Sequence, residues 1–228
     1  MIIGITGGIG SGKSTIAQEL TKRGYQVYDC DREAKRIATE ERVVRSSITH
    51  LLGEEAYTTI EREGLAPRIV YNTAYVAKRA FADPDILRHL NAIIHPILKH
   101  EIRLFKEHYD TLFVESAILF ESGLDRMCDK IAIVCAPDNV RIKRTIKRDY
   151  NGESTPENIA AVKARMNRQT SFRLPAEDAP SLSRLRYKAQ SIMRKIAGAV
   201  YPITPVIYLN NDGKTPIPEL TDSLLEQL

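Results

Sequence analysis

The chain has 228 residues, of which 43% are hydrophobic and 27% charged, and its formal net charge is +4. This length allows one sizeable α/β core with an inserted lobe, and the composition is ordinary for a soluble globular protein. The longest apolar runs are too short to cross a bilayer, and so mild a positive charge does not argue for nucleic acid. The three scattered cysteines form no C-x-x-C pair, which argues against a disulfide framework or a zinc site. We therefore expect a cytoplasmic protein without a signal peptide, a membrane partner or a nucleic-acid partner.

The chain opens with a strand pattern followed by a glycine-rich loop. Residues 7–15 read Gly-Gly-Ile-Gly-Ser-Gly-Lys-Ser-Thr and fit the phosphate-binding pattern G-x-x-x-x-G-K-[ST]. Glycines let backbone N–H groups converge on an anion, and the following helix adds the partial positive charge of its N-terminus. Lys13, expected to be exposed in this loop, would reach the β/γ-phosphates, and the Ser14 hydroxyl would ligate Mg²⁺. The residues expected to contact ATP are Gly8, Gly10, Ser11, Gly12, Lys13, Ser14 and Thr15.

Five short apolar runs predict the strands of a parallel sheet. Their continuous apolarity indicates burial on both faces, and helical patterns separate them, which is typical of a doubly wound α/β fold. The predicted strands are Ile2–Thr6, Gln26–Asp29, Leu112–Glu115, Ile131–Cys135 and Val206–Leu209.

The interval between the second and third strands is longer than one crossover helix requires. It contains helical patterns over 32–39, 42–52 and 84–108, so we interpret it as a mostly helical inserted lobe that could bind a second substrate. Pro96 would break or kink the last of these helices and place His95 at a bend. A lone histidine in such a place is either structural or a substrate ligand.

A second excursion follows the fourth strand. A helix is predicted from Pro137-Asp138 through Asp149, and a second one, with Thr155 as N-cap and Pro156 at its first position, to about Gln169. Beyond it, the composition predicts a loop over 175–183 and a helix over 182–199.

Two carboxylates follow the second strand. Asp29 and Asp31 should face the phosphate loop, because ligands of open α/β sheets bind at the carboxyl ends of the strands. A carboxylate there can accept the proton of an attacking hydroxyl, whereas the alternative is that one of the pair caps the helix near Arg32. We choose Asp31 as the base because Asp29 is nearer the buried strand.

Other charged side chains fall at strand ends and on one helical face. Glu115 ends the third strand, where a carboxylate can hold Mg²⁺ or its waters, although a structural role is also possible. Arg141, Arg144 and Arg148 are spaced i, i+3 and i+7 and share a face. They are interpreted either as a solvated face or as a lid over the β/γ-phosphates, a role that Arg165 and Arg168 could share.

Taken together, these segments resemble the dephospho-CoA kinase family. The resemblance covers most of the chain in the expected order. The matching segments are Gly4 to Thr15, Asp29-Cys30-Asp31 with Ala34 and Lys35, Phe81 to Pro84, Ile94-His95-Pro96, Glu115 to Glu121, Arg144 to Asp149, Arg165 to Gln169, and Asn210 to Gly213.

The resemblance implies a P-loop NTPase fold with three parts in one integrated domain, 1–228. These are a nucleotide-binding core (1–31, 110–139 and 170–228), a helical acceptor-binding lobe (32–109) and a short helical lid (140–169). It implies ATP and Mg²⁺, and phosphoryl transfer to the ribose 3′-hydroxyl of dephospho-CoA. Implied roles are catalysis by Asp31, Lys13, Arg144 and Arg148, substrate contacts from Asp31, His95 and Arg165, and metal binding by Ser14 and Glu115.

Three alternatives remain from the residues alone. Another P-loop kinase of a small metabolite or a nucleoside monophosphate would carry the same loop. A GTP-dependent switch is less well supported because no N-K-x-D motif occurs, and a nucleic-acid-binding ATPase is less well supported because the charge is mild.

Overall fold

A computed structural model describes residues 1–167, 169 and 204–228, so Arg168 and the predicted segments 175–183 and 182–199 lie outside the described residues. The chain divides into two compact units. The first comprises Met1–Val27 and Tyr109–Leu228, and the second is Tyr28–His108.

The first unit is built on a five-stranded parallel sheet with the order β2-β5-β1-β6-β7. The strands are β1 (Ile2–Thr6), β2 (Gln26–Asp29), β5 (Leu112–Glu115), β6 (Lys130–Cys135) and β7 (Val206–Asn210). The predicted strands are thus confirmed, with β6 beginning one residue earlier and β7 ending one residue later. The boundary between the two units falls inside β2, the edge strand.

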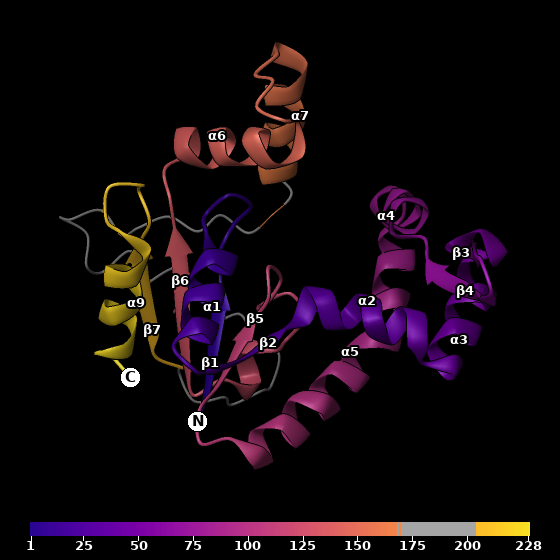
Figure 1. Ribbon diagram of the computed structural model, residues 1–228, viewed down its shortest axis with the longest axis horizontal. Helices are drawn as coiled ribbons and strands as arrows, with labels where there is room; N and C mark the ends of the chain where they lie inside the picture. The colour runs from indigo at the N-terminus through magenta and orange to yellow at the C-terminus, as the bar shows by residue number, and fades with distance from the viewer. Residues whose placement is uncertain (168, 170–203) are drawn as a thin grey trace. The chain divides into compact units, whose positions relative to one another are not determined.

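The core of this unit lies between the sheet and two helices. Helix α1 (Lys13–Lys22) buries Ile16 and Leu20, and helix α9 (Ile217–Leu225) buries Leu220 and Leu224. The two helices lie side by side against the sheet (Figure 1). Apolar side chains of β1, β5, β6 and β7 complete a cluster that includes Phe113, which is fully buried. This packing holds the carboxyl end of β1 and the start of α1 in fixed positions.

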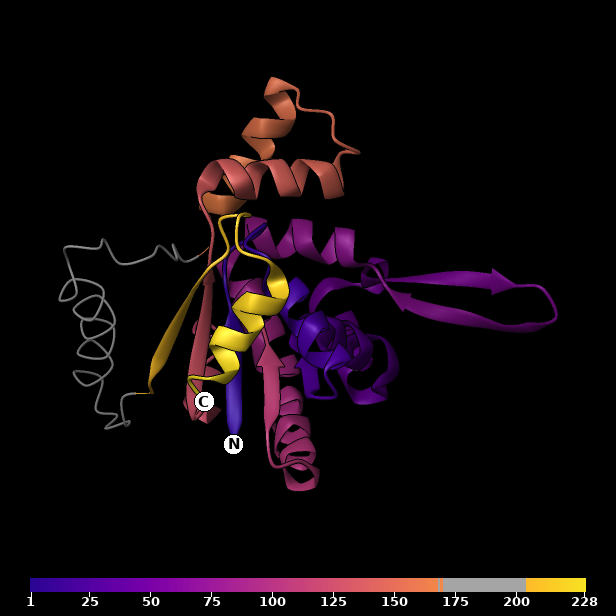
Figure 2. The same ribbon diagram turned by 60° about the vertical axis from the view of Figure 1, so that its left-hand side comes forward.

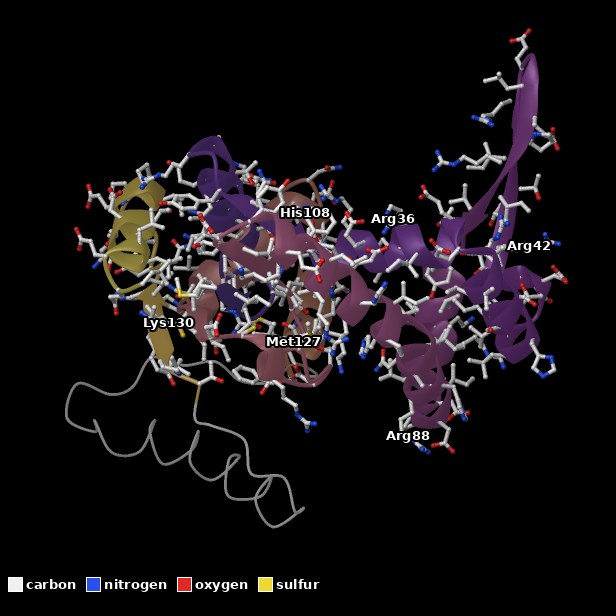
Figure 3. All side chains as sticks on the ribbon, turned by 90° about the horizontal axis from the view of Figure 1, so that it is seen from below. Arg36, Arg42, Arg88, His108, Met127 and Lys130 are labelled. Atoms are coloured by element: carbon white, nitrogen blue, oxygen red, sulfur yellow. The ribbon has the colours of Figure 1, made fainter. Side chains whose placement is uncertain are left out.

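Helices α6 (Asp138–Asp149) and α7 (Pro156–Asn167) lie beyond the carboxyl end of β6 (Figure 1). The predicted cap of α7 is confirmed, because Thr155 Oγ1 accepts a hydrogen bond from the Asn158 N–H at 3.2 Å. A 3₁₀ turn (Asp125–Met127) leads into β6. At the start of that strand Lys130, labelled in Figure 3, donates to the carbonyls of Gln227 and Leu228.

The second unit contains helices α2 (Cys30–Glu40), α3 (Arg42–Leu52), α4 (Thr73–Ala82) and α5 (Pro84–His108), with a 3₁₀ turn over Glu54–Ala56. Their buried apolar faces pack on one another. Helix α5 continues through Pro96, so of the two predicted outcomes, a break or a kink, the break is wrong. The helix tolerates the missing N–H because Leu90, Ile94, Leu98 and Ile102 bury one continuous face. Among the described residues, no helix has both the length and the apolarity needed to span a bilayer.

The second unit also contains an antiparallel hairpin that the sequence prediction missed. Strands β3 (Tyr57–Arg62) and β4 (Leu65–Tyr71) pair directly, and Gly64 adopts a positive φ of 68° at the turn. The hairpin extends away from the helices of its own unit (Figure 2). Within the described range 28–108 the lobe is mostly helical as expected, with four α-helices, and the hairpin is an addition to them.

Candidate active site

The glycine-rich loop occupies the turn between β1 and α1, at the carboxyl end of a central strand. Gly10 and Gly12 have φ values of 74° and 95°, which are left-handed conformations that favour glycine. A Cβ on Gly12 would also lie 2.1 Å from Asn211 Nδ2. Helix α1 begins at Lys13, so the positive end of its dipole lies at the loop, where it favours a bound anion, although the Thr15 N–H of the first turn already donates to the Gly12 carbonyl at 3.1 Å.

Lys13, Ser14 and Glu115 meet at this point of the sheet. Lys13 Nζ lies 3.1 Å from Glu115 Oε1, and the Ser14 hydroxyl donates to the same oxygen at 2.6 Å. Glu115 is buried at the end of β5, and the parallel register places it opposite Ile5 of β1. The prediction that Lys13 is exposed is wrong, because this ion pair leaves only 15% of its side chain accessible. The parallel sheet brings the predicted metal ligands together although they are 101 residues apart.

Ser14 and Glu115 fit a magnesium ion in chemical type. Mg²⁺ takes oxygen ligands and commonly uses one or two protein groups beside substrate phosphates. The hydroxyl and the carboxylate already share a hydrogen bond, so their oxygens converge on one small region. The carboxylate that pairs with Lys13 is thus also the candidate metal ligand.

Arg141, at the start of α6, holds the first part of the loop. Its Nε donates to the Ile9 carbonyl at 2.9 Å, and its Nη1 pairs with Asp138 at 3.2 Å. The guanidinium packs directly over Gly8, where a Cβ would lie 2.3 Å from Nη2. Arg141 is buried, so its contacts in this structure are with the loop backbone rather than with solvent.

Arg144, one turn later, holds the second part of the loop together with Asn211. Its Nη1 lies 3.3 Å from the Ser11 carbonyl and 3.2 Å from the Asn211 carbonyl, and its Nη2 donates to Asn211 Oδ1 at 2.9 Å. Asn211 Nδ2 donates in turn to the Ser11 carbonyl at 2.8 Å. The interpretation of these arginines as a merely solvated face therefore does not describe Arg141 or Arg144.

Arg148 and Arg165 meet at Asp149 instead of at the loop. Arg148 Nε and Arg165 Nη1 each lie 2.6 Å from an Asp149 carboxylate oxygen. Hydrogen bonds from Arg148 and then from Arg165 outweigh burial and lower the pKa of Asp149 to about 2. Asp149 thus joins α6 to α7, and the structure places Arg148 and Arg165 in this ion-pair network.

In the second unit, Asp29 is the N-cap of α2. Its Oδ1 accepts a hydrogen bond from the Arg32 N–H at 3.0 Å, and Asp31 lies exposed in the first helical turn. The sequence left open which of the two carboxylates caps the helix, and the structure shows that Asp29 does so. Acidic side chains in this first turn also interact favourably with the helix dipole.

A hydrogen-bonded network fastens α2 to α5 within the second unit. Arg36, labelled in Figure 3, donates to both oxygens of Glu101 at 2.6 and 2.7 Å and to Glu33 at 2.6 Å. The Tyr28 hydroxyl donates to Glu101 at 2.5 Å. Burial and then Glu101 raise the pKa of Tyr28 well above its ordinary value. This network fixes the end of α2 that carries Asp31.

His95 lies half-buried on α5. Burial, and then the charge of Lys99, lower the pKa of His95, so the imidazole is neutral near pH 7. A neutral imidazole can donate or accept a hydrogen bond but supplies no positive charge to a phosphate.

Three residues at the loop were not assigned a specific contact from the sequence. Asn211 and Arg141 contact the loop as described, and Gln169 Oε1 accepts a hydrogen bond from the Ile9 N–H at 2.7 Å. Asn211 and Gln169 lie in segments that the family resemblance includes, which is the only signal that could have pointed to them.

The fold and the loop define the class of protein. A parallel sheet whose central strand leads through a G-x-x-x-x-G-K-S loop into a helix is the nucleotide-binding core of a P-loop NTPase. A crystal structure from Thermus thermophilus matches with a TM-score of 0.66 and 27% identity, covering 100% of this chain and 95% of that one. A dephospho-CoA kinase from Campylobacter jejuni shares the fold with a TM-score of 0.51 at 19% identity, covering 99% of this chain and 96% of that one.

Sequence comparisons give the family. The dephospho-CoA kinase family model matches residues 1–176. The dephospho-CoA kinase of Porphyromonas gingivalis is 38% identical over 157 residues, which is 67% of this chain and 72% of the relative. That of Chlorobaculum tepidum is 32% identical over 166 residues, which is 71% of this chain and 78% of the relative. The chain belongs to the dephospho-CoA kinase family and is an ATP-dependent kinase that transfers phosphate to an alcohol group.

Proposed function

We propose that this chain transfers the γ-phosphate of ATP, with Mg²⁺, to the ribose 3′-hydroxyl of dephospho-CoA and so produces coenzyme A. The observation that carries the nucleotide end is the convergence of Lys13 and Ser14 on the buried Glu115 beside the glycine loop. Membership of the family supports dephospho-CoA as the acceptor.

At the nucleotide end, the loop N–H groups and Lys13 bind the phosphates. On this proposal Lys13 exchanges its contact with Glu115 for the β/γ-phosphates when ATP binds. Arg144 and Arg148 then stabilise the charge on the transferred group, which is the role that guanidinium groups serve in P-loop enzymes. In support, Arg144 already lies at the loop backbone, while Arg148 stands one turn further along the same helix.

Ser14 and Glu115 would hold Mg²⁺ at this end. The ion would supply charge neutralisation at the β- and γ-phosphates. On this proposal Glu115 pairs with Lys13 when no nucleotide is bound and contacts the magnesium ion when nucleotide is bound. Its burial keeps the carboxylate in place for both.

At the acceptor end, Asp31 is the proposed base. Its carboxylate accepts the proton of the 3′-hydroxyl as that oxygen bonds to the γ-phosphorus and the bond to the ADP oxygen breaks. The capping of α2 by Asp29 supports this division of roles, because it leaves Asp31 as the second carboxylate of the pair. His95, as a neutral hydrogen-bonding group, and Arg165, as a phosphate-binding cation, are the proposed acceptor contacts.

We also infer a cytoplasmic enzyme that acts on small molecules and not on nucleic acid. The cysteines at positions 30, 128 and 135 are buried thiols, which suits a reducing compartment, and the net charge of +4 is small.

An acceptor screen tests this proposal. The purified chain is incubated with ATP and Mg²⁺, and ADP release is measured with dephospho-CoA, nucleoside monophosphates and other small alcohols, each supplied separately. We expect dephospho-CoA to give the highest kcat/KM by orders of magnitude. If a nucleoside monophosphate or another metabolite gave the highest kcat/KM instead, the proposed acceptor would be wrong and the P-loop assignment would stand.

A further inference from the structure

Asn211 follows β7 directly and is nearly inaccessible, at 2% exposure. Its backbone N–H donates to the Cys135 carbonyl at 2.8 Å, so the residue is fixed at the carboxyl end of the β6–β7 pair. Its side chain reaches across to the phosphate loop, 200 residues earlier in the sequence. A polar side chain so deeply buried must have its hydrogen-bonding groups paired.

Both groups of the Asn211 amide are in use, and in a way that defines their orientation. Nδ2 donates to the Ser11 carbonyl at 2.8 Å, and Oδ1 accepts from Arg144 Nη2 at 2.9 Å. A carbonyl can only accept and a guanidinium can only donate, so the amide cannot be reversed. Gly12 packs against the same Nδ2, and any side chain there would displace Asn211.

The bond to the Ser11 carbonyl also fixes the neighbouring N–H group. In a planar trans peptide the carbonyl of Ser11 and the N–H of Gly12 point in opposite directions, and no peptide bond among the described residues is cis. Because Asn211 and Arg144 hold the carbonyl on one side, the Gly12 N–H faces the other side. The preceding N–H, that of Ser11, is instead turned inward to the Gly8 carbonyl at 3.0 Å.

We propose that Asn211 is a positioning residue for the phosphate loop: its side-chain amide sets the Ser11–Gly12 peptide so that the Gly12 N–H points toward the bound phosphates. Asn211 itself contacts the loop backbone and Arg144, and acts on the nucleotide through them. The inference rests on the nucleotide site of the proposed function but not on the identity of the acceptor.

Calorimetric titration with ADP tests this role in three variants. Asn211→Ala removes both hydrogen bonds, and Asn211→Asp keeps an acceptor for Arg144 but removes the donor to Ser11. Asn210→Asp makes the same chemical change at the exposed neighbouring residue and controls for the added negative charge. We expect both Asn211 variants to bind ADP about tenfold more weakly, the effect of one hydrogen bond, and the Asn210 variant to bind normally.

Kinetics and thermal unfolding separate positioning from simple packing. Positioning predicts that the KM for ATP rises in the Asn211 variants by more than kcat falls. A packing role alone would lower the thermal midpoint and leave ADP affinity unchanged in the folded variant, and that result would overturn the inference. Unchanged KM for ATP with normal formation of coenzyme A would also overturn it and would leave the proposed function standing.

A measurement on the unmodified chain covers the case in which the Asn211 variants do not fold. The Gly12 amide resonance should move on addition of ADP, and by more than the Ser11 resonance, whose N–H is already bonded within the loop. A Gly12 resonance that stays in place would contradict the proposed orientation.

Discussion

At the scale of single residues, Lys13 makes an ion pair in this structure and has a different contact in the proposed reaction. It pairs with the buried Glu115 in this structure and would bind phosphates during turnover. We predict that Lys13→Ala abolishes turnover and also lowers the thermal midpoint, because a buried carboxylate that loses its cation is costly. Lys22→Ala is the control, since Lys22 ends the same helix and is 76% exposed.

Steady-state assays and thermal unfolding of the two lysine variants test this prediction. The Lys22 variant should match the unmodified chain in both measurements. Near-native turnover in folded Lys13→Ala would remove Lys13 from the phosphate site.

Substitutions at Asp29 and Asp31 should have different effects: the first should lower stability and the second should lower catalytic rate. Asp29→Ala removes the N-cap of α2, and we expect a loss of about 1 kcal/mol, or about 2–4 °C in Tm for a chain of this size. Asp31→Asn keeps the size of the side chain but cannot accept a proton, so we expect a loss of at least about 10²-fold in kcat with Tm preserved.

Circular dichroism and single-turnover kinetics on these two variants decide between the roles. If Asp31→Asn lowers Tm and retains kcat, Asp31 is structural. The base would then be sought at Asp29, where Asp29→Asn should be the damaging change.

At the scale of elements, α6 presents arginines with different surroundings. Arg144 bonds to the loop and to Asn211, whereas Arg148 pairs with Asp149 and is 60% exposed. We predict that Arg144→Ala weakens ADP binding as well as kcat, because the loop loses its brace. Arg148→Ala should lower kcat with ADP affinity nearly unchanged. Calorimetry and kinetics on both variants test this, and equal effects would show that the two arginines act in the same way.

The ion pairs through which Asp149 joins α6 to α7 should be lost at acid pH. The pKa of Asp149 is held at about 2 by Arg148 and Arg165, below its ordinary 3.8. A carboxylate with a depressed pKa contributes stability that is fully present above the ordinary pKa and is lost as pH falls through the depressed one. The window is therefore about pH 4 to 2.

Asp149→Asn keeps the shape of the side chain and removes the charge. Because the partner arginines are largely exposed, we expect a loss of no more than about 1 kcal/mol near neutral pH. In urea unfolding at a series of pH values, the difference between the variant and the unmodified chain should vanish toward pH 2. A difference that persists there would assign Asp149 a role other than ion pairing.

The elements differ in how far the sequence predicts them. Buried parallel strands are continuous apolar runs between helical patterns, and all five were predictable from that pattern. The hairpin was missed although Tyr57 to Ile60 is rich in strand-forming residues, because the neighbouring helical patterns dominated the interpretation of that interval. The break that Pro96 was expected to allow does not occur, because packing of the buried face of α5 outweighs one missing hydrogen bond.

The candidate site, too, is predictable from the sequence only in part. The proximity of the loop, Ser14 and Glu115 could be predicted, because they lie at the carboxyl ends of predicted parallel strands. The contacts of Asn211 and Arg141 with the loop arise from tertiary packing over 132 residues or more, for which a single sequence carries no local signal.

At the scale of the whole molecule, the proposed function assigns different parts of the reaction to the two units. The first unit contains the loop, Glu115 and the arginines of α6, and the second contains Asp31 and His95. ADP binding should therefore be insensitive to Asp31→Asn, while phosphoryl transfer is not. Whether the product is coenzyme A depends on whether dephospho-CoA is the molecule that accepts the phosphate.

The most direct measurement follows the phosphate itself. The chain is incubated with Mg²⁺, dephospho-CoA and ATP labelled in its γ-phosphate, and the products are separated and identified. We predict that the label moves to a product identical with coenzyme A, phosphorylated on the ribose 3′-hydroxyl. Label found only in inorganic phosphate, or dephospho-CoA recovered unchanged while another acceptor is phosphorylated, would contradict it.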